Sequence, residues 1–143
     1  MIKIFLSLFI TLFSINSIAN EISVIDAAKE LNNGLVIIDV RNVEEWKETG
    51  IIPESKLIQM LSPKGTIRNE FISELLTTLG EDKNIKAAII CRSGRRSSAT
   101  VAMLKDQGFT NILNISEGML GDGNTTGWKN KNLPLKECIE ECK

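Results

Sequence analysis

The chain has 143 residues, of which 43% are hydrophobic and 24% are charged, a balance typical of one globular domain with a substantial core. Its formal net charge of −1 excludes the broad positive surface that general nucleic-acid binding requires. It contains no histidine, which excludes Ser-His-Asp triads, Cys-His dyads and histidine-based zinc sites. A cysteine nucleophile here must therefore be activated by nearby charges and N–H groups instead of an imidazole base.

The first 19 residues have the pattern of an export signal. Lys3 supplies a positive charge, residues 4–15 are almost continuously apolar, and Ser17-Ile18-Ala19 places small residues where a signal peptidase reads them. The apolar stretch is shorter than the roughly 20 residues of a membrane-spanning helix. We therefore expect cleavage after Ala19 and not an uncleaved anchor, so that the export signal is the only membrane contact. The predicted organisation is a signal peptide at 1–19, one domain at 20–143, and a periplasmic or otherwise exported location.

Apolar runs alternate with amphipathic stretches along the rest of the chain. This pattern predicts a short strand or helix approach at 22–25 and strands at 35–40, 56–60, 87–91 and 111–115. It predicts helices at 26–31, 43–48, 69–79 and 97–107, each followed by a glycine within three residues. Strands that alternate with helices favour an α/β domain with a mostly parallel sheet, in which ligands bind beyond the carboxyl ends of the strands.

One thiol stands at such a strand end. Cys91 follows the apolar run 87–90 and precedes Arg92-Ser93-Gly94-Arg95-Arg96-Ser97. A strand-to-helix turn directs several N–H groups at one point, and the next helix adds its positive N-terminal end. The glycine allows a close bend, the arginines suit an oxyanion, and Ser97 and Ser98 can cap the helix. We expect Cys91 to be a catalytic thiolate, in preference to a buried structural cysteine, and residues 92–97 to bind substrate.

The loop from Cys91 to Arg96 resembles the six-residue active-site loop of single-domain rhodaneses. Further similarities to this family are Asp39-Val40-Arg41 followed by Glu45-Trp46, Gly50-Ile51-Ile52-Pro53, Gly108-Phe109-Thr110-Asn111, Glu117-Gly118-Met119, Gly127-Trp128 and Leu133-Pro134. The resemblance implies a three-layer domain with a sheet of about five strands flanked by helices. It also implies a thiosulfate sulfurtransferase that needs no cofactor and no metal. Two departures are Ile51, where many members have histidine, and an extended loop at 120–126 that could alter access of the acceptor.

The resemblance also implies a mechanism. Cys91 would take the outer sulfur of thiosulfate or a similar donor as a persulfide, and pass it to cyanide, a small thiol or a thiol on a partner protein. Arg92 and Arg96 would bind the sulfonate end of the donor. The alternatives are a cysteine-based phosphatase or arsenate reductase of related fold, and a non-catalytic sulfur-carrier or binding module. Those phosphatases resemble a pattern with arginine six residues after the cysteine, where this chain has Ser97, so the shorter loop favours sulfur over phosphate.

Other conspicuous residues favour structural roles. We expect Asp39 and Arg41 to pair near the strand ends, and the two tryptophans, Trp46 and Trp128, to pack in the core or at its rim. Cys138 and Cys142 lie in a cysteine-containing tail, residues 136–143, and a disulfide between them requires the tail to leave helix geometry. For these two cysteines we favour a local staple or two idle thiols over an acceptor or resolving pair for the Cys91 persulfide. Two thiols alone make a weak metal site.

Overall fold

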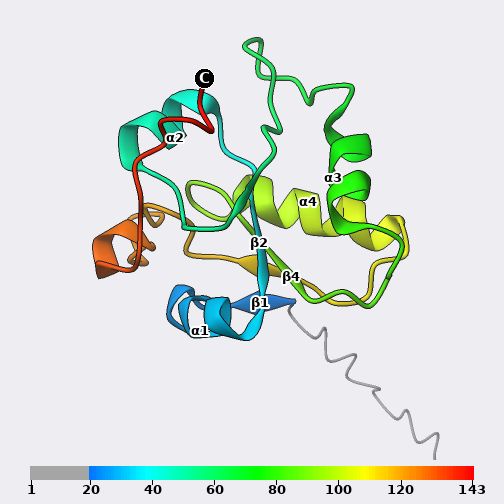
Figure 1. Ribbon diagram of the computed structural model, residues 1–143, viewed down its shortest axis with the longest axis horizontal. Coiled ribbons are helices and arrows are strands. Elements are labelled where there is room, and N and C mark those ends of the chain that lie inside the picture. Colours follow the sequence, from blue (N-terminus) through cyan, green and yellow to red (C-terminus); the bar gives the residue numbers. More distant parts are fainter. Residues whose placement is uncertain (1–19) are drawn as a thin grey trace, which may run out of the picture.

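The computed structural model describes residues 20–143, and the predicted signal peptide lies outside them. In this range five parallel strands form one sheet in the order β1-β5-β4-β2-β3. Figure 1 labels β1, β4 and β2 of this sheet and the helices around it. The strands are β1 Glu21–Ile22, β2 Val36–Asp39, β3 Lys56–Leu57, β4 Ala87–Ile90 and β5 Ile112–Ile115. The α-helices are α1 Val24–Glu30, α2 Val43–Thr49, α3 Phe71–Leu79 and α4 Arg95–Asp106, and none of them is long and apolar enough to cross a bilayer.

The two central strands bury both of their faces, which explains their continuous apolar sequences. Ile38 and Ile89 point to one face and pack in a cluster with residues of α3 and α4. Ile37 and Ile90 point to the other face and pack with residues of α1 and with Trp128. The sheet therefore lies between two layers, and the predicted α/β fold with about five strands is confirmed.

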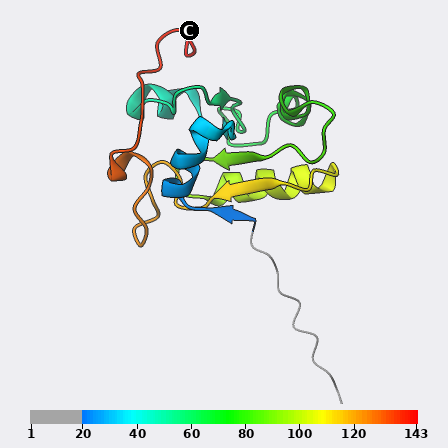
Figure 2. The same ribbon diagram turned by 60° about the horizontal axis from the view of Figure 1, so that its bottom comes forward.

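The carboxyl ends of the strands meet at one edge of the sheet. Figure 2 shows the arrows of β1, β4 and β5 pointing to the same side of the molecule. Strand β3 is shorter than the predicted 56–60, but the chain after it stays beside the end of β2, because the N–H of Ile58 donates to the Asp39 carbonyl at 3.0 Å. The connections that leave this edge are thus close enough to build a common site.

Helix α4 begins earlier than the sequence pattern predicts. Gly94 is its N-cap residue, with a φ of 90°, so the chain turns sharply and the helix starts at Arg95, not at Ser97. The prediction that Ser97 and Ser98 cap this helix is wrong, since both lie within its first turn and no side chain caps it. The earlier start frees the Ser97 hydroxyl for another contact, at the sulfur of Cys91.

Candidate active site

Cys91 lies directly after β4, in the middle of the sheet, where connections from several strands converge. Its carbonyl accepts a hydrogen bond from the N–H of Met119, in the segment after β5, at 2.8 Å. The preceding residue, Ile90, accepts from the N–H of Val40 after β2 at 2.9 Å. The backbone around the cysteine is therefore held on both sides by segments that are distant in sequence.

The sulfur of Cys91 lies within hydrogen-bond distance of two groups. It accepts from the backbone N–H of Gly94 at 3.2 Å, and the Ser97 hydroxyl oxygen lies 3.3 Å from it. Both groups belong to the start of α4, a helix of twelve residues whose N-terminal end carries partial positive charge. Cys91 is a free cysteine and only 1% exposed. The N–H and the helix end favour an anionic sulfur electrostatically, whereas burial by itself disfavours a charge and keeps water away.

Two glycines bring the segment after β5 against the loop that contains the cysteine. Gly94 and Gly118 both have positive φ values, 90° and 66°. A Cβ atom on Gly94 would collide with the carbonyl of Ser116, and one on Gly118 would collide with the backbone of Arg92. Next to this contact, the N–H of Leu120 donates to the Arg92 carbonyl at 3.0 Å. The extended loop at 120–126 therefore begins beside the candidate site.

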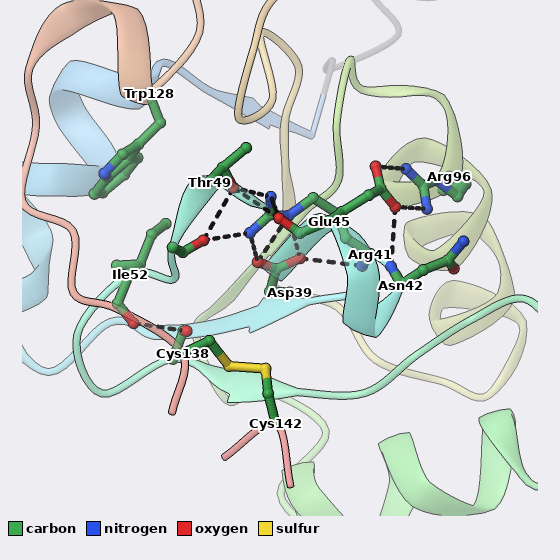
Figure 3. A network of polar contacts seen from close by, with 12 residues as sticks. Asp39, Arg41, Asn42, Glu45, Thr49, Ile52, Arg96, Trp128, Cys138 and Cys142 are labelled. Atoms are coloured by element: carbon green, nitrogen blue, oxygen red, sulfur yellow. Dashed lines mark hydrogen bonds and ion pairs between the residues drawn. A yellow bond between two sulfur atoms is a disulfide. The ribbon is translucent and has the colours of Figure 1, made fainter. Parts of the chain in front are cut away.

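The three arginines of the loop differ in their surroundings. Arg92 and Arg95 are exposed and form no ion pair with any of residues 20–143. Arg96 is partly buried, and both of its terminal nitrogens bind the carboxylate of Glu45 in α2, at 2.7 and 2.8 Å (Figure 3). The same carboxylate accepts the N–H of Asn42 at 2.9 Å. Of the predicted substrate-binding residues 92–97, Gly94 and Ser97 thus contact the sulfur, Arg92 and Arg95 are exposed, and Arg96 already has an anionic partner.

The Glu45–Arg96 pair stays charged over a wide pH range. Burial raises the pKa of Glu45, but hydrogen bonds from Arg96 and the Asn42 N–H, with the nearby positive charges, outweigh burial and lower the pKa below its usual value. The pKa of Arg96 is raised, mainly by its hydrogen bond with Glu45 and against the effect of burial. No local pattern predicts this role of Glu45, whose only signal in the sequence is its position in the motif after Arg41.

Asp39 and Arg41 form a buried network beneath α2. Both side chains are at most 1% exposed, and their carboxylate and guanidinium groups are 2.7 Å apart. Arg41 also donates to the Thr49 hydroxyl at 2.6 Å and to the Gly50 carbonyl at 3.0 Å, so it joins the end of β2 to the end of α2 (Figure 3). The predicted structural pairing is confirmed. The Asp39–Arg41 pair affects the site only indirectly, because it holds in place helix α2, which carries Glu45.

Cys138 and Cys142 form a disulfide, and the tail around them is not helical. Their Cα atoms are 5.6 Å apart, and Cys142 packs in a small cluster with Trp46 and Ile51. Figure 3 shows this disulfide well separated from the Glu45–Arg96 pair. Of the two expectations, that of a local link between the cysteines is therefore confirmed and that of two idle thiols is not, and the tail leaves helix geometry as expected. The predicted packing of both tryptophans is confirmed too, since each is at most 4% exposed.

Comparison with known proteins places this arrangement in a family. A model of the Rhodanese-like domain matches residues 23–123. An uncharacterized protein of Rickettsia prowazekii is 33% identical over 104 residues, covering 73% of this chain and 85% of its own. A Bacillus subtilis protein named "Putative sulfurtransferase YtwF" is 37% identical over 105 residues, covering 73% of this chain and 84% of its own. The crystal structure of Rv0390 from M. tuberculosis has a TM-score of 0.70 at 25% identity, covering 82% of this chain and 97% of its own. The chain with Cys91 at the end of its central strand belongs to the Rhodanese-like domain family.

Proposed function

We propose that this protein is a sulfurtransferase that carries sulfane sulfur as a persulfide on Cys91. The observation that carries the proposal is the position of the Gly94 N–H and the Ser97 hydroxyl beside the sulfur, at the N-terminal end of a helix. With the sulfur ionised, as a thiolate or a persulfide, both groups donate to it. The name of the B. subtilis relative, which refers to a sulfurtransferase, supports the same chemistry.

The first step loads the cysteine. The Cys91 thiolate attacks the outer sulfur of thiosulfate, a new S–S bond forms, and the bond inside thiosulfate breaks. Sulfite leaves with the electron pair of that bond, so the step needs no outside oxidant. Arg92 and Arg95, which are exposed beside the loop, attract the sulfonate end of the donor. Arg96 contributes mainly by holding the loop through Glu45.

The second step unloads the cysteine. A nucleophilic acceptor attacks the terminal sulfur of the persulfide, and the Cys91 thiolate leaves and is restored. Cyanide as the acceptor yields thiocyanate, and a thiolate yields a new persulfide on the acceptor. The Gly94 N–H and the helix end favour this second step as well, because they stabilise the leaving thiolate.

The arrangement of Arg96 argues against the phosphatase alternative. Cysteine-based phosphoryl transfer depends on an arginine that grips the phosphoryl oxygens with both of its terminal nitrogens. In this chain both terminal nitrogens of Arg96 already bind Glu45. The loop closed by Arg96 is also one residue shorter than in those phosphatases, which leaves less room for a tetrahedral phosphate before the sulfur.

Intact-mass analysis after treatment with thiosulfate tests the proposal. We expect a gain of one sulfur mass that is absent from Cys91→Ser and retained in a Cys138→Ser/Cys142→Ser control. Cyanide should then remove the adduct and release one equivalent of thiocyanate. Hydrolysis of an aryl phosphate without thiocyanate formation would establish the phosphatase alternative. A protein that forms no adduct and no product would be a binding module.

We also propose that the protein acts outside the cytoplasm, with a small thiol, cyanide or a partner protein's thiol as acceptor. The support is the pattern of residues 1–19, together with a disulfide in the tail, which is typical of oxidising compartments. Expression of the full chain in a bacterium, followed by cell fractionation and N-terminal sequencing, tests the location. We expect a periplasmic protein that begins at Asn20. Recovery of an uncleaved chain in the cytoplasm would contradict export.

A further inference from the structure

The tail holds two sulfur atoms, joined in a disulfide, that the proposed sulfur transfer does not use. We propose that the Cys138–Cys142 disulfide is a thiol-exchange site that reacts with dithiols at Cys138, and that its opening uncovers Trp46. The proposed reaction at this disulfide does not involve Cys91. A test of it is therefore independent of a test of the sulfurtransferase proposal.

The two sulfurs of the disulfide differ in access. Cys142 is 6% exposed and belongs to the buried cluster with Trp46 and Ile51, whereas Cys138 is only half-buried and packs at the edge of that cluster. Cys138 also borders a hollow of about 400 Å³ between the end of α2 and the tail. An attacking thiolate must reach a sulfur along the S–S bond, so access decides which sulfur it attacks. We therefore expect the thiolate to attack the sulfur of Cys138, with the sulfur of Cys142 as the leaving group.

The lining of the hollow indicates which thiols fit. Apolar contact comes from Leu135 and from Ile139, whose side chain is 58% exposed. Two lysines and two glutamates also line the hollow, so its formal charge is balanced. A small uncharged dithiol, or a dithiol on an extended peptide, meets neither a strong attraction nor a strong repulsion there.

The disulfide contributes little to the fold itself. It closes a ring across a sequence separation of only four residues, and short rings restrict the unfolded chain least. The tail is joined to the domain before the ring begins, because Lys136 and Ile51 exchange two backbone hydrogen bonds of 2.9 Å. Reduction would therefore leave the sheet and this attachment intact, which is the requirement for a disulfide that opens in the native state.

Opening of the ring would change the surface of α2. Beyond Lys136, Cys142 packs with Trp46 and Ile51, and Cys138 packs at the edge of the same cluster. The ion pairs Lys136–Glu141 and Lys143–Glu140 lie within the tail and do not join it to the domain. The tail therefore loses most of its hold once the two cysteines can move apart. Trp46 then loses its cover. Its indole N–H has no acceptor in the part of the chain that the structure describes, so contact with water satisfies it.

The exchange is balanced. A thiolate of the dithiol attacks the Cys138 sulfur, a mixed disulfide forms, and the Cys142 thiolate leaves and takes up a proton. The second thiol of the dithiol then attacks its partner sulfur in the mixed disulfide, which releases Cys138 as a thiol. The protein gains two electrons and two protons, and the dithiol becomes a cyclic disulfide.

The experiment uses dithiothreitol and a Cys91→Ser background, in which the active-site thiol cannot react. We expect native protein to gain the mass of two hydrogen atoms on reduction, with unchanged circular dichroism. The site of attack is tested on the intact ring: a short reaction with the monothiol 2-mercaptoethanol, quenched with acid, traps the mixed disulfide, and peptide mass analysis identifies the cysteine that carries it. We expect the adduct on Cys138 at least about tenfold more often than on Cys142, because Cys138 is more accessible. Reduction that requires denaturant, or equal labelling of the two cysteines, would overturn the proposal.

Tryptophan fluorescence tests the uncovering of Trp46. Reduction of the Cys91→Ser protein should shift the emission to longer wavelength, since Trp46 becomes exposed. The same protein with Trp46→Phe retains only the buried Trp128, and its emission should not shift. If reduction is complete by mass and the emission of the Trp46-containing protein is unchanged, the tail stays in place and the proposal is wrong.

Discussion

The two sulfur sites of this protein are fixed by different kinds of contact. The sulfur of Cys91 accepts a backbone N–H, and its loop is packed between segments that leave the central strands. The tail cysteines depend on each other and on the packing of Cys142 against Trp46. The first site is continuous with the core of the sheet, and the second is attached to its surface. A change near the first should therefore cost far more stability than a change near the second.

Helix α2 lies between the two sites and contacts both. Glu45 binds Arg96 at the loop, and the next residue, Trp46, packs against Cys142 of the tail. Successive residues of a helix point in different directions, so one short helix serves both sites. The same helix is anchored to β2 by Arg41.

The largest expected effect follows from breaking the buried pair below α2. Arg41→Met leaves the Asp39 carboxylate buried without its partner, and we expect a loss of about 3–5 kcal/mol in the free energy of unfolding. The double variant Cys138→Ser/Cys142→Ser should lose roughly 2 kcal/mol or less, because it removes only a short ring. Urea unfolding measures both. A larger loss at the tail would contradict the contrast between the two sites.

A matched pair of glycines tests the close packing of the Cys91 loop. Gly94 and Gly108 both have a φ of 90°, but only Gly94 has backbone atoms where a Cβ would lie. Gly108→Ala should cost about 1 kcal/mol from backbone strain, and Gly94→Ala about 2–4 kcal/mol because a steric clash is added. Thermal or urea unfolding measures the difference. Equal costs would show that the segment after β5 adapts freely to the loop.

A smaller and pH-dependent effect is expected at Glu45. The pKa of Glu45 in the folded protein lies below its ordinary value of 4.5, which applies to the unfolded chain. Ionisation of Glu45 therefore adds to the free energy of unfolding at pH values above 4.5. This stabilisation is lost as pH falls through the folded-state pKa. Glu45→Gln should therefore cost about 1 kcal/mol at neutral pH and progressively less in acid. Urea unfolding as a function of pH measures this, with the exposed neighbour Glu44→Gln as the control that should show little change.

The smallest effect is expected at the Ser97 hydroxyl. Ser97→Ala removes the oxygen that lies 3.3 Å from the Cys91 sulfur, and alkylation of Cys91 by iodoacetamide should slow by about threefold to tenfold. Ser98 is exposed on the same turn, so Ser98→Ala should react at the wild-type rate. The tail cysteines do not interfere, because they are joined in the disulfide. Equal rates for the two variants would assign the stabilisation of the sulfur to the Gly94 N–H and the helix end alone.

Local patterns were sufficient to predict the fold class and the position of the central cysteine. The apolar run before Cys91 identifies a buried strand, and the change to glycine and arginine marks its end. The start of α4 was placed too late, because serines are good helix caps in general and the left-handed turn at Gly94 is not visible in the sequence. That error hid the contact between Ser97 and the sulfur.

By itself, the sequence determined that a thiol stands at the carboxyl end of a buried strand, followed by a glycine and three arginines. Strand ends and turns depend on residues that are neighbours in the chain, so a local pattern is enough to identify them. Only the tertiary structure decided that Arg96 binds Glu45, 51 positions earlier, whereas Arg92 and Arg95 stay free of carboxylate partners among residues 20–143. It also decided that Cys142 is buried with Trp46 and Ile51, whereas Cys138 stays partly exposed at the edge of the same cluster. Such pairings depend on how distant segments pack against one another.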